Sequence, residues 1–153
     1  MKIKIGILLI ISYLIAFVIN FLPSMKYPDA NINLVNLLAT ILLLGVLIIF
    51  TNKMRGTKRS PKLLRIFYIF GIIAGVLVLV LKMLEDYTLK YAILDIIASI
   101  QYPLYVFFTT PFFGANMLFN VNYATFAVFT SLFYMLMLVL MGIVGNNKVK
   151  SSI

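Results

Sequence analysis

Residues 52–65 read Asn-Lys-Met-Arg-Gly-Thr-Lys-Arg-Ser-Pro-Lys-Leu-Leu-Arg, the one long polar stretch in the sequence. Strongly apolar segments flank it on both sides, so we interpret it as a loop between two membrane spans. Loops rich in lysine and arginine stay on the cytoplasmic side of a membrane, so this loop predicts the orientation of the whole chain. Its cations are expected to contact anionic lipid headgroups; they are Lys53, Arg55, Lys58, Arg59, Lys62 and Arg65.

The composition predicts that lipid rather than water surrounds most of the chain. Of its 153 residues, 63% are hydrophobic and only 11% are charged, and the mean hydropathy is +1.10. Soluble globular proteins carry about 25% charged residues, so a chain this poor in charge does not have the polar surface that water requires. The expected fold class is an all-α integral membrane protein, a four-transmembrane-helix bundle that forms a single membrane domain over residues 1–153.

The residue types exclude several kinds of chemistry. Cysteine and histidine are both absent, which excludes disulfides, thiol chemistry, and zinc or haem sites built on those ligands. No paired-carboxylate motif, phosphate-binding glycine loop or Gly-x-Ser-x-Gly turn occurs in the sequence. We therefore expect no catalytic residue, no metal and no cofactor. The net charge of +9 is attributed to cations that set the topology, because no basic-aromatic pattern of a nucleic-acid module accompanies it.

Four apolar stretches are long enough to cross a bilayer as helices. The first follows Lys2 and Lys4 and lacks the short core and small-residue cleavage site of a signal peptide, so we interpret it as an uncleaved span with its N-terminus inside. Pro23 is expected to end this span. Tyr13 and Asn20 share a face that is expected to pack against another helix. The expected spans are about 5–22, 33–51, 66–84 and 123–144.

The segment between the third and the last span is the ambiguous part of the chain. Residues 87–119 are apolar enough to enter a membrane, but Pro103 should break or kink a helix there. If the segment re-enters or lies along the external surface, there are four spans and both termini are cytoplasmic. If it crosses fully, there are five. The positive-inside bias favours four spans, because Lys148 and Lys150 then join the other cations inside.

Two groups of residues predict helix-packing faces. Gly71 and Gly75 form a Gly-xxx-Gly pair in the third span, where the missing side chains let another helix approach closely. Asn33, Asn36 and Thr40 fall at i, i+3 and i+7 and form a polar stripe near the outer end of the second span. Buried asparagine amides in membrane bundles usually bridge helices, so we interpret this stripe as a packing feature rather than a ligand site.

A second polar stripe, in the ambiguous segment, is the candidate for chemistry. Helical spacing aligns Tyr91, Asp95, Ser99 and Tyr102 on one face. A carboxylate at mid-bilayer depth costs roughly 2.5–3.5 kcal/mol and is commonly functional, which would make the stripe a proton or cation site, or a polar groove for a partner. We favour the structural interpretation, in which Asp95 lies near the outer headgroups and pairs with a neighbouring lysine or a tyrosine hydroxyl.

These patterns predict a broad role rather than a reaction. We expect a non-enzymatic plasma-membrane protein, an accessory, assembly or protective factor that acts through helix contacts with itself or with another membrane protein. The packing faces and the outer segment would carry those contacts. The alternative hypothesis is a small oligomeric transporter or channel with Asp95 in its polar path, and a membrane enzyme ranks third. The abundance of isoleucine, lysine and asparagine suggests a bacterial source.

Overall fold

A computed structural model describes residues 2–54 and 60–150, with side chains over 4–54 and 62–141. The protein is all-helical, with 86% of its residues in helices and no strand in the part described. Four helices are long and apolar enough to cross a membrane, as the sequence predicts. They are α1 (Lys2–Met25), α2 (Leu34–Met54), α3 (Ser60–Met83) and α8 (Tyr123–Lys150).

The polar loop between α2 and α3 is shorter than predicted. α2 continues to Met54 and α3 begins at Ser60, so Lys62 and Arg65 lie on α3 rather than in the loop. Pro61 accounts for the early start of α3. Proline is favoured in the first turn of a helix, where its missing N–H would have no helical partner.

α1 also extends beyond its predicted end. The sequence predicts that Pro23 ends this helix, but the helix continues through Pro23 to Met25. A proline inside a helix lacks the N–H that would donate to the carbonyl four residues earlier. That carbonyl belongs to Ile19, and the Asn36 side chain on α2 donates to it over 2.9 Å. The neighbouring helix therefore supplies the hydrogen bond that Pro23 cannot make.

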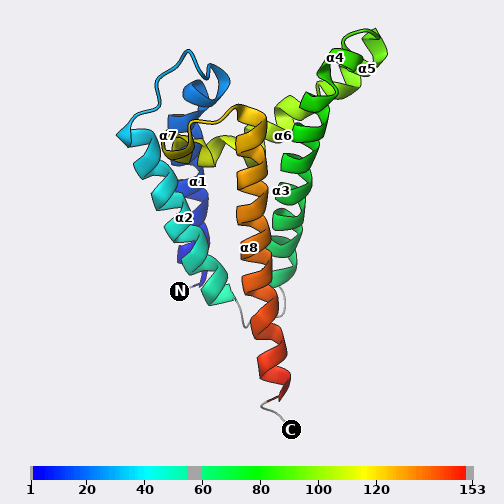
Figure 1. Ribbon diagram of the computed structural model, residues 1–153. Coiled ribbons are helices and arrows are strands. Elements are labelled where there is room, and N and C mark those ends of the chain that lie inside the picture. Colours follow the sequence, from blue (N-terminus) through cyan, green and yellow to red (C-terminus); the bar gives the residue numbers. More distant parts are fainter. Residues whose placement is uncertain (1, 55–59, 151–153) are drawn as a thin grey trace.

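The four long helices form two pairs. α1 packs along α2 and α3 packs along α8, while the two pairs touch each other only sparsely (Figure 1). The start of α1, the end of α2 and the start of α3 lie at one end of the molecule, and α8 extends beyond them in the same direction (Figure 1). We call this the basic end, and the other the capped end, because short helices cover it between the two pairs.

The segment between α3 and α8 is a series of short helices. The chain bends by 67° between residues 92–108 and 110–119. α3 ends and α8 begins at the capped end, so the segment returns to the end from which it departs (Figure 1). Its elements are α4 (Glu85–Thr88), α5 (Ala92–Ala98), α6 (Gln101–Phe108), the 3-10 helix η1 (Thr110–Ala115) and α7 (Asn116–Phe119).

The helix breaks in this segment are not at Pro103. Pro103 lies in the first turn of α6, a position that tolerates proline because the first N–H groups of a helix have no partner within it. The breaks fall instead between α5 and α6 and at Thr109, directly before η1. The predicted helix-break-helix pattern is present, but its main bend comes six residues later in the chain, next to Pro111.

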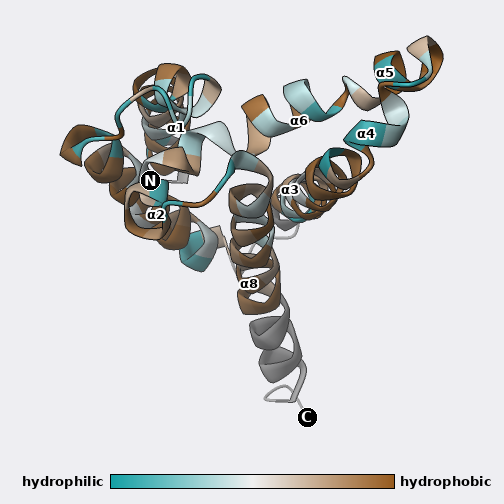
Figure 2. Ribbon diagram, turned by 45° about the horizontal axis from the view of Figure 1, so that its top comes forward, coloured by the Kyte–Doolittle hydropathy of each residue, from teal (hydrophilic) through white to brown (hydrophobic). Residues whose placement is uncertain are grey.

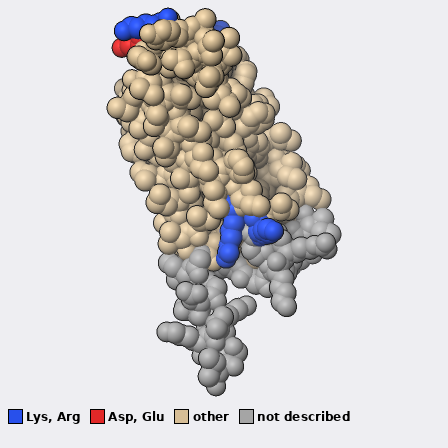
Figure 3. All heavy atoms as spheres, turned by 90° about the vertical axis from the view of Figure 1, so that its right-hand side faces the viewer, with Lys and Arg blue, Asp and Glu red and all other residues tan. Residues whose placement is uncertain are grey.

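Where their side chains are described, the outer surface of the long helices is apolar over most of their length. Figure 2 shows hydrophobic residues around the outside of all four, and leucine and valine side chains are exposed on each. Charged side chains lie at the ends, and acidic residues appear at only one of them in the face shown in Figure 3. Such a surface is costly in water and typical of helices surrounded by lipid, which suggests a membrane protein.

Candidate functional site

The most enclosed element is η1, which lies between the two helix pairs at the capped end (Figure 1). Every residue from Thr110 to Gly114 is buried, and η1 packs on both α1 and α2. The missing side chain at Gly114 allows η1 to lie very close to α2. A Cβ at this position would lie within 3.0 Å of the Asn36 carbonyl oxygen and of Thr40 Oγ1. Because the Asn36 oxygen belongs to the backbone, a larger residue at 114 would displace η1 or α2.

The end of α6 is held by tyrosines from both helix pairs. Where a helix ends, its last carbonyls lose their helical partners, and inside a membrane such groups must bond to protein. The Tyr13 hydroxyl on α1 donates to the Phe107 carbonyl over 2.5 Å, and the Tyr134 hydroxyl on α8 donates to the Phe108 carbonyl over 2.9 Å. These bonds satisfy the backbone that the break at Thr109 exposes.

One carbonyl of η1 is bonded by both α1 and α2. Asn20 Nδ2 donates to the Pro111 carbonyl over 3.1 Å, and Thr40 Oγ1 donates to the same oxygen over 3.3 Å. Asn20 Nδ2 also donates to Thr40 Oγ1 over 3.1 Å. Both side chains are fully buried. We call Tyr13, Asn20, Thr40 and Tyr134 the anchoring residues, because each donates to the backbone at or beside η1.

Several other polar groups near η1 are also hydrogen-bonded. Ser24 Oγ and Thr110 Oγ1 lie 3.1 Å apart and share a hydrogen bond, and the Tyr105 hydroxyl reaches the Ser24 carbonyl at 3.5 Å. Asn20 Oδ1 is buried and has no hydrogen-bond partner among the described residues. The cluster thus consists of neutral amides, hydroxyls and carbonyls, which can hold a helix break in place but offer no group that titrates near neutral pH.

The residues of the predicted stripe on α2 have two different structural roles. Asn36 bonds the Ile19 carbonyl of α1, and Thr40 bonds η1, so both bridge elements as predicted. Asn33 does not. Its Oδ1 accepts hydrogen bonds from the N–H groups of Val35 and Asn36 over 3.0 and 3.3 Å. Asn33 is exposed and caps the start of α2, because the first N–H groups of a helix have no partner within it.

The glycine pair lies where α3 meets α8. A Cβ at Gly71 would lie within 3.0 Å of the Tyr134 ring, and one at Gly75 would lie within 3.0 Å of Ser131 Oγ and of the Ala127 carbonyl oxygen. Ser131 Oγ donates to the Ile72 carbonyl over 3.2 Å, which links the two helices. The missing side chains thus bring the α8 backbone close to α3, the kind of contact that Gly-xxx-Gly pairs predict.

Aromatic rings fix the position of Tyr134. Its ring lies edge-on to Phe67, Phe108 and Phe112, with centroids 5.7, 6.4 and 5.5 Å away. Edge-to-face packing of this kind is favourable because the positive ring edge meets the negative ring face. α3, α6, η1 and α8 therefore converge on one buried tyrosine, whose hydroxyl is directed at the end of α6.

These contacts change the expectation about partner surfaces. The glycine face and the Asn36–Thr40 face are filled by elements of the same chain, as Gly71, Gly75, Asn36 and Thr40 are all buried. Neither face is open to a second protein in this structure. Contacts with another molecule must therefore use other surfaces, because a face packed to interior density leaves no room for a partner.

The candidate polar stripe lies away from the anchoring residues. Tyr91, Asp95, Ser99 and Tyr102 are all exposed, and Asp95 and Ser99 lie on or directly after α5, which projects away from the helix pairs (Figure 1). Ser99 Oγ donates to the Ile96 carbonyl of its own helix over 2.6 Å. Within the described residues the ion pair joins Lys82 to Glu85, and none involves Asp95. The stripe therefore faces the surroundings and does not line a path between the long helices.

The cations of the polar stretch lie at the basic end where they are described. Lys53 lies in the last turn of α2, and Lys62 and Arg65 lie in the first turns of α3; all are exposed, as is Lys4 on α1. Arg55, Lys58 and Arg59 lie outside the described residues. Long exposed cations at the end of a span can extend along the helix to reach lipid headgroups, so this placement is compatible with the predicted headgroup contact.

Part of this arrangement has a signal in the sequence. The shared face of Tyr13 and Asn20 predicts a packing contact, and the structure shows what that face contacts, namely the carbonyls of the broken segment. Tyr134 has no such signal, because it is one aromatic residue in an aromatic-rich span. No group of three or more His, Cys, Asp or Glu side chains able to hold a metal ion occurs in the part described.

Comparison with protein-family models, with curated proteins and with solved structures finds no match to this chain. A functional hypothesis must therefore be built from the geometry alone.

Proposed function

We propose that the chain is a small multi-pass plasma-membrane protein whose basic end and both termini face the cytoplasm. The distribution of charge supports this orientation. The described charged side chains at the basic end are all cationic, whereas the acidic residues Asp29, Glu85, Asp86 and Asp95 belong to segments at the capped end. Cationic segments are retained on the cytoplasmic side. Residues 87–119 then form a membrane-associated segment on the external side. Within it, α6 and η1 re-enter the membrane between the four spans.

Within that membrane, we propose a non-enzymatic accessory, assembly or protective factor that acts by contact with a second membrane protein or a second copy of this chain. The observation that carries the proposal is the arm, which we define as residues 85–100. α4 and α5 pack on each other, and Figure 1 shows them projecting beyond the end of α3. The arm is the part of the described chain that extends furthest from the two helix pairs.

The arm exposes an apolar face that the chain itself does not cover. Ile93, Ile96, Ile97 and Ile100 are all exposed and lie within one arc of α5 and its C-terminal turn, because residues three and four apart share a helix face. Asp95 and Ser99 lie on the opposite side, so this short helix is amphipathic. An exposed apolar face rimmed by polar residues is typical of an interaction site. We assign partner contact to this isoleucine face.

Photo-crosslinking in native membranes tests the assignment. A photoreactive amino acid at Ile96, whose side chain is 72% exposed, should yield a discrete protein adduct, and the mass of the adduct separates a homodimer from a different partner. Val18 on α1 is a matched control, since it is 71% exposed but lies on a long helix. At Val18 we expect adducts with lipid only.

Lipid adducts alone at both positions would overturn the proposal, because the isoleucine face would then be an anchor in the outer leaflet. The alternative, a small oligomeric transporter or channel with Asp95 in its polar path, gains no support within a single copy, because α5 with Asp95 projects away from the long helices. Activity measurements bear on it independently: solute flux into proteoliposomes that is abolished by Asp95→Asn would favour transport over contact.

A further inference from the structure

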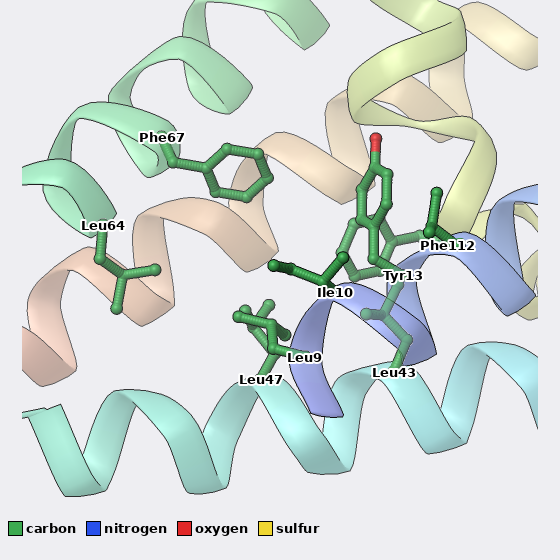
Figure 4. Close-up of a pocket in the computed structure, with 9 residues that line it drawn as sticks. Leu9, Ile10, Tyr13, Leu43, Leu47, Leu64, Phe67 and Phe112 are labelled. Atoms are coloured by element: carbon green, nitrogen blue, oxygen red, sulfur yellow. The ribbon is translucent and has the colours of Figure 1, made fainter. Parts of the chain in front are cut away.

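A cleft of about 250 Å³ lies in the half of the molecule toward the basic end, between α1 on one side and α3 on the other. Figure 4 shows Leu9, Ile10 and Tyr13 of α1 facing Leu64 and Phe67 of α3 across it. Leu14 of α1, Leu43 and Leu47 of α2, and Phe112 of η1 complete the lining. The lining side chains are apolar except for the Tyr13 hydroxyl, which is already bonded to the Phe107 carbonyl.

The position and the volume of the cleft favour a hydrocarbon chain as its ligand. α1 and α3 belong to different helix pairs and make little contact, so the cleft opens sideways between two spans. In a bilayer, that opening faces lipid. A further helix would need an axis-to-axis distance of roughly 8–10 Å from each neighbour. Pockets that bind drug-sized ligands measure about 300–1,000 Å³. A cleft of about 250 Å³ is smaller than such pockets and suits one flexible chain.

The charge at this end selects the headgroup. Leu64 lines the cleft two residues after Lys62, which is about 3 Å along a helix axis. Lys4, Lys53 and Arg65 lie at the same end and are exposed, and no acidic residue is present among the described residues there. A lipid whose chain enters the cleft from this end therefore has its headgroup at the level of these cations. Anionic headgroups are attracted to such clusters.

We propose that the cleft between α1 and α3 binds one acyl chain of an anionic phospholipid from the leaflet at the basic end. The bound lipid fills the space between the two helix pairs below η1, where the chain itself leaves a gap. The site is distinct from the isoleucine face of the arm. It rests on the membrane location and orientation of the proposed function, but not on the identity of any partner protein.

The absence of tryptophan from the chain makes a direct test possible. A single tryptophan is introduced as Ile10→Trp, whose native side chain lines the cleft and is 62% exposed, or as Leu14→Trp, a second lining position. The control is Ile49→Trp, at a side chain that is 53% exposed but does not line the cleft. Leu9 and Leu47 both line the cleft. Ile10 directly follows Leu9, and Ile49 comes two residues, or about half a helical turn, after Leu47. The reporters at positions 10 and 49 therefore lie at similar depth. Each variant is reconstituted into phosphatidylcholine vesicles in which either the phosphatidylcholine or added phosphatidylglycerol carries brominated chains.

Bromine quenches tryptophan fluorescence on contact, so the relative quenching gives the relative affinity for the two lipids. We expect the cleft reporters to favour phosphatidylglycerol about fivefold more than Ile49→Trp does, the ratio that corresponds to about 1 kcal/mol. Adding Lys62→Gln and Arg65→Gln should return that ratio to the value at Ile49→Trp. An unchanged ratio in that background would overturn the headgroup assignment.

Other outcomes overturn the proposal in distinguishable ways. Equal lipid preference at the cleft and control positions would mean that the cleft has no site for an anionic lipid. Quenching at Ile49→Trp without quenching at either cleft reporter would mean that protein closes the cleft. Absence of quenching at all positions would contradict the membrane location itself, and with it the proposed function.

Discussion

At the scale of single residues, Pro23 and Asn36 complement each other across α1 and α2. Pro23 leaves the Ile19 carbonyl without its helical donor, and Asn36 Nδ2 occupies that acceptor over 2.9 Å. Asn36 Oδ1 in turn accepts the Asn33 N–H over 3.0 Å. One amide therefore serves the end of one span and the start of the next. A buried carbonyl without a donor costs more than an ordinary hydrogen bond contributes, so this pairing is important for stability.

We expect Asn36→Leu to lower the free energy of unfolding by about 1–3 kcal/mol, because it leaves the Ile19 carbonyl without a hydrogen-bond donor. In a Pro23→Ala background the loss should be smaller, since the restored N–H at position 23 can donate to the same carbonyl. Reversible unfolding in mixed micelles, followed by circular dichroism, measures both values. An equal loss in the two backgrounds would show that the Ile19 carbonyl is not the critical acceptor.

Gly114 gives a second prediction at the residue scale. Gly114→Ala should destabilise the protein by about 1–3 kcal/mol, the usual cost of overpacking, because the added Cβ meets the Asn36 backbone oxygen. Gly45→Ala on α2 is the matched control. Nothing lies within 4 Å of a Cβ at Gly45, and alanine is favoured over glycine in a helix by up to about 1 kcal/mol. Thermal unfolding of both variants in one detergent tests the contrast, and similar melting temperatures would contradict it.

At the scale of elements, η1 connects the two helix pairs. Direct contacts between the pairs are sparse, while η1 packs on α1 and α2 and its neighbour α6 packs on α3. Tyr134 of α8 donates to the Phe108 carbonyl just before η1. The relative position of the pairs at the capped end thus depends on the broken segment, which acts as a spacer of fixed shape. Loosening it should affect the contact between the pairs before it affects either pair.

Tyr134→Phe tests this dependence, since it keeps the aromatic packing and removes the donor to the Phe108 carbonyl. We expect faster amide hydrogen exchange at Thr109 and Phe112, with protection within α3 and α8 unchanged, because exchange reports local opening. Tyr87→Phe on the arm is the control, because Tyr87 is exposed and its hydroxyl has no hydrogen-bond partner among the described residues. Exchange that rises equally across α3 and α8 would contradict a role confined to the broken segment.

At the scale of the whole molecule, segregated charge sets the expected topology. Single cysteines can be introduced without background because the chain contains none. We expect Asp95→Cys on the arm to react with a membrane-impermeant maleimide added to intact cells, and Asn52→Cys at the basic end to react only after permeabilisation. Both native side chains are exposed, so local burial does not decide the result. The reverse pattern would invert the orientation proposed from the positive-inside bias.

Much of the fold follows from the sequence, but the connection between its parts does not. Apolar runs bounded by charge identify the four long helices, and the glycine spacing identifies the face of α3 that meets α8. The roles of Asn20 and Tyr134 could not be predicted. Which carbonyls need a donor depends on where the helix breaks, and the break falls at Thr109 rather than at Pro103. Pro103 lies in the first turn of α6, a position that tolerates proline, so its presence does not locate the break.

The distribution of the anchoring residues along the chain also bears on how the molecule is made. A ribosome delivers the N-terminal part first, so Tyr13, Asn20 and Thr40 are already in place when the broken segment emerges. Tyr134 is synthesised last, so the Phe108 carbonyl lacks this donor until α8 has been made. A nascent polypeptide arrested before α8 would therefore leave this backbone oxygen without its donor, in the environment that the proposed function assigns to lipid.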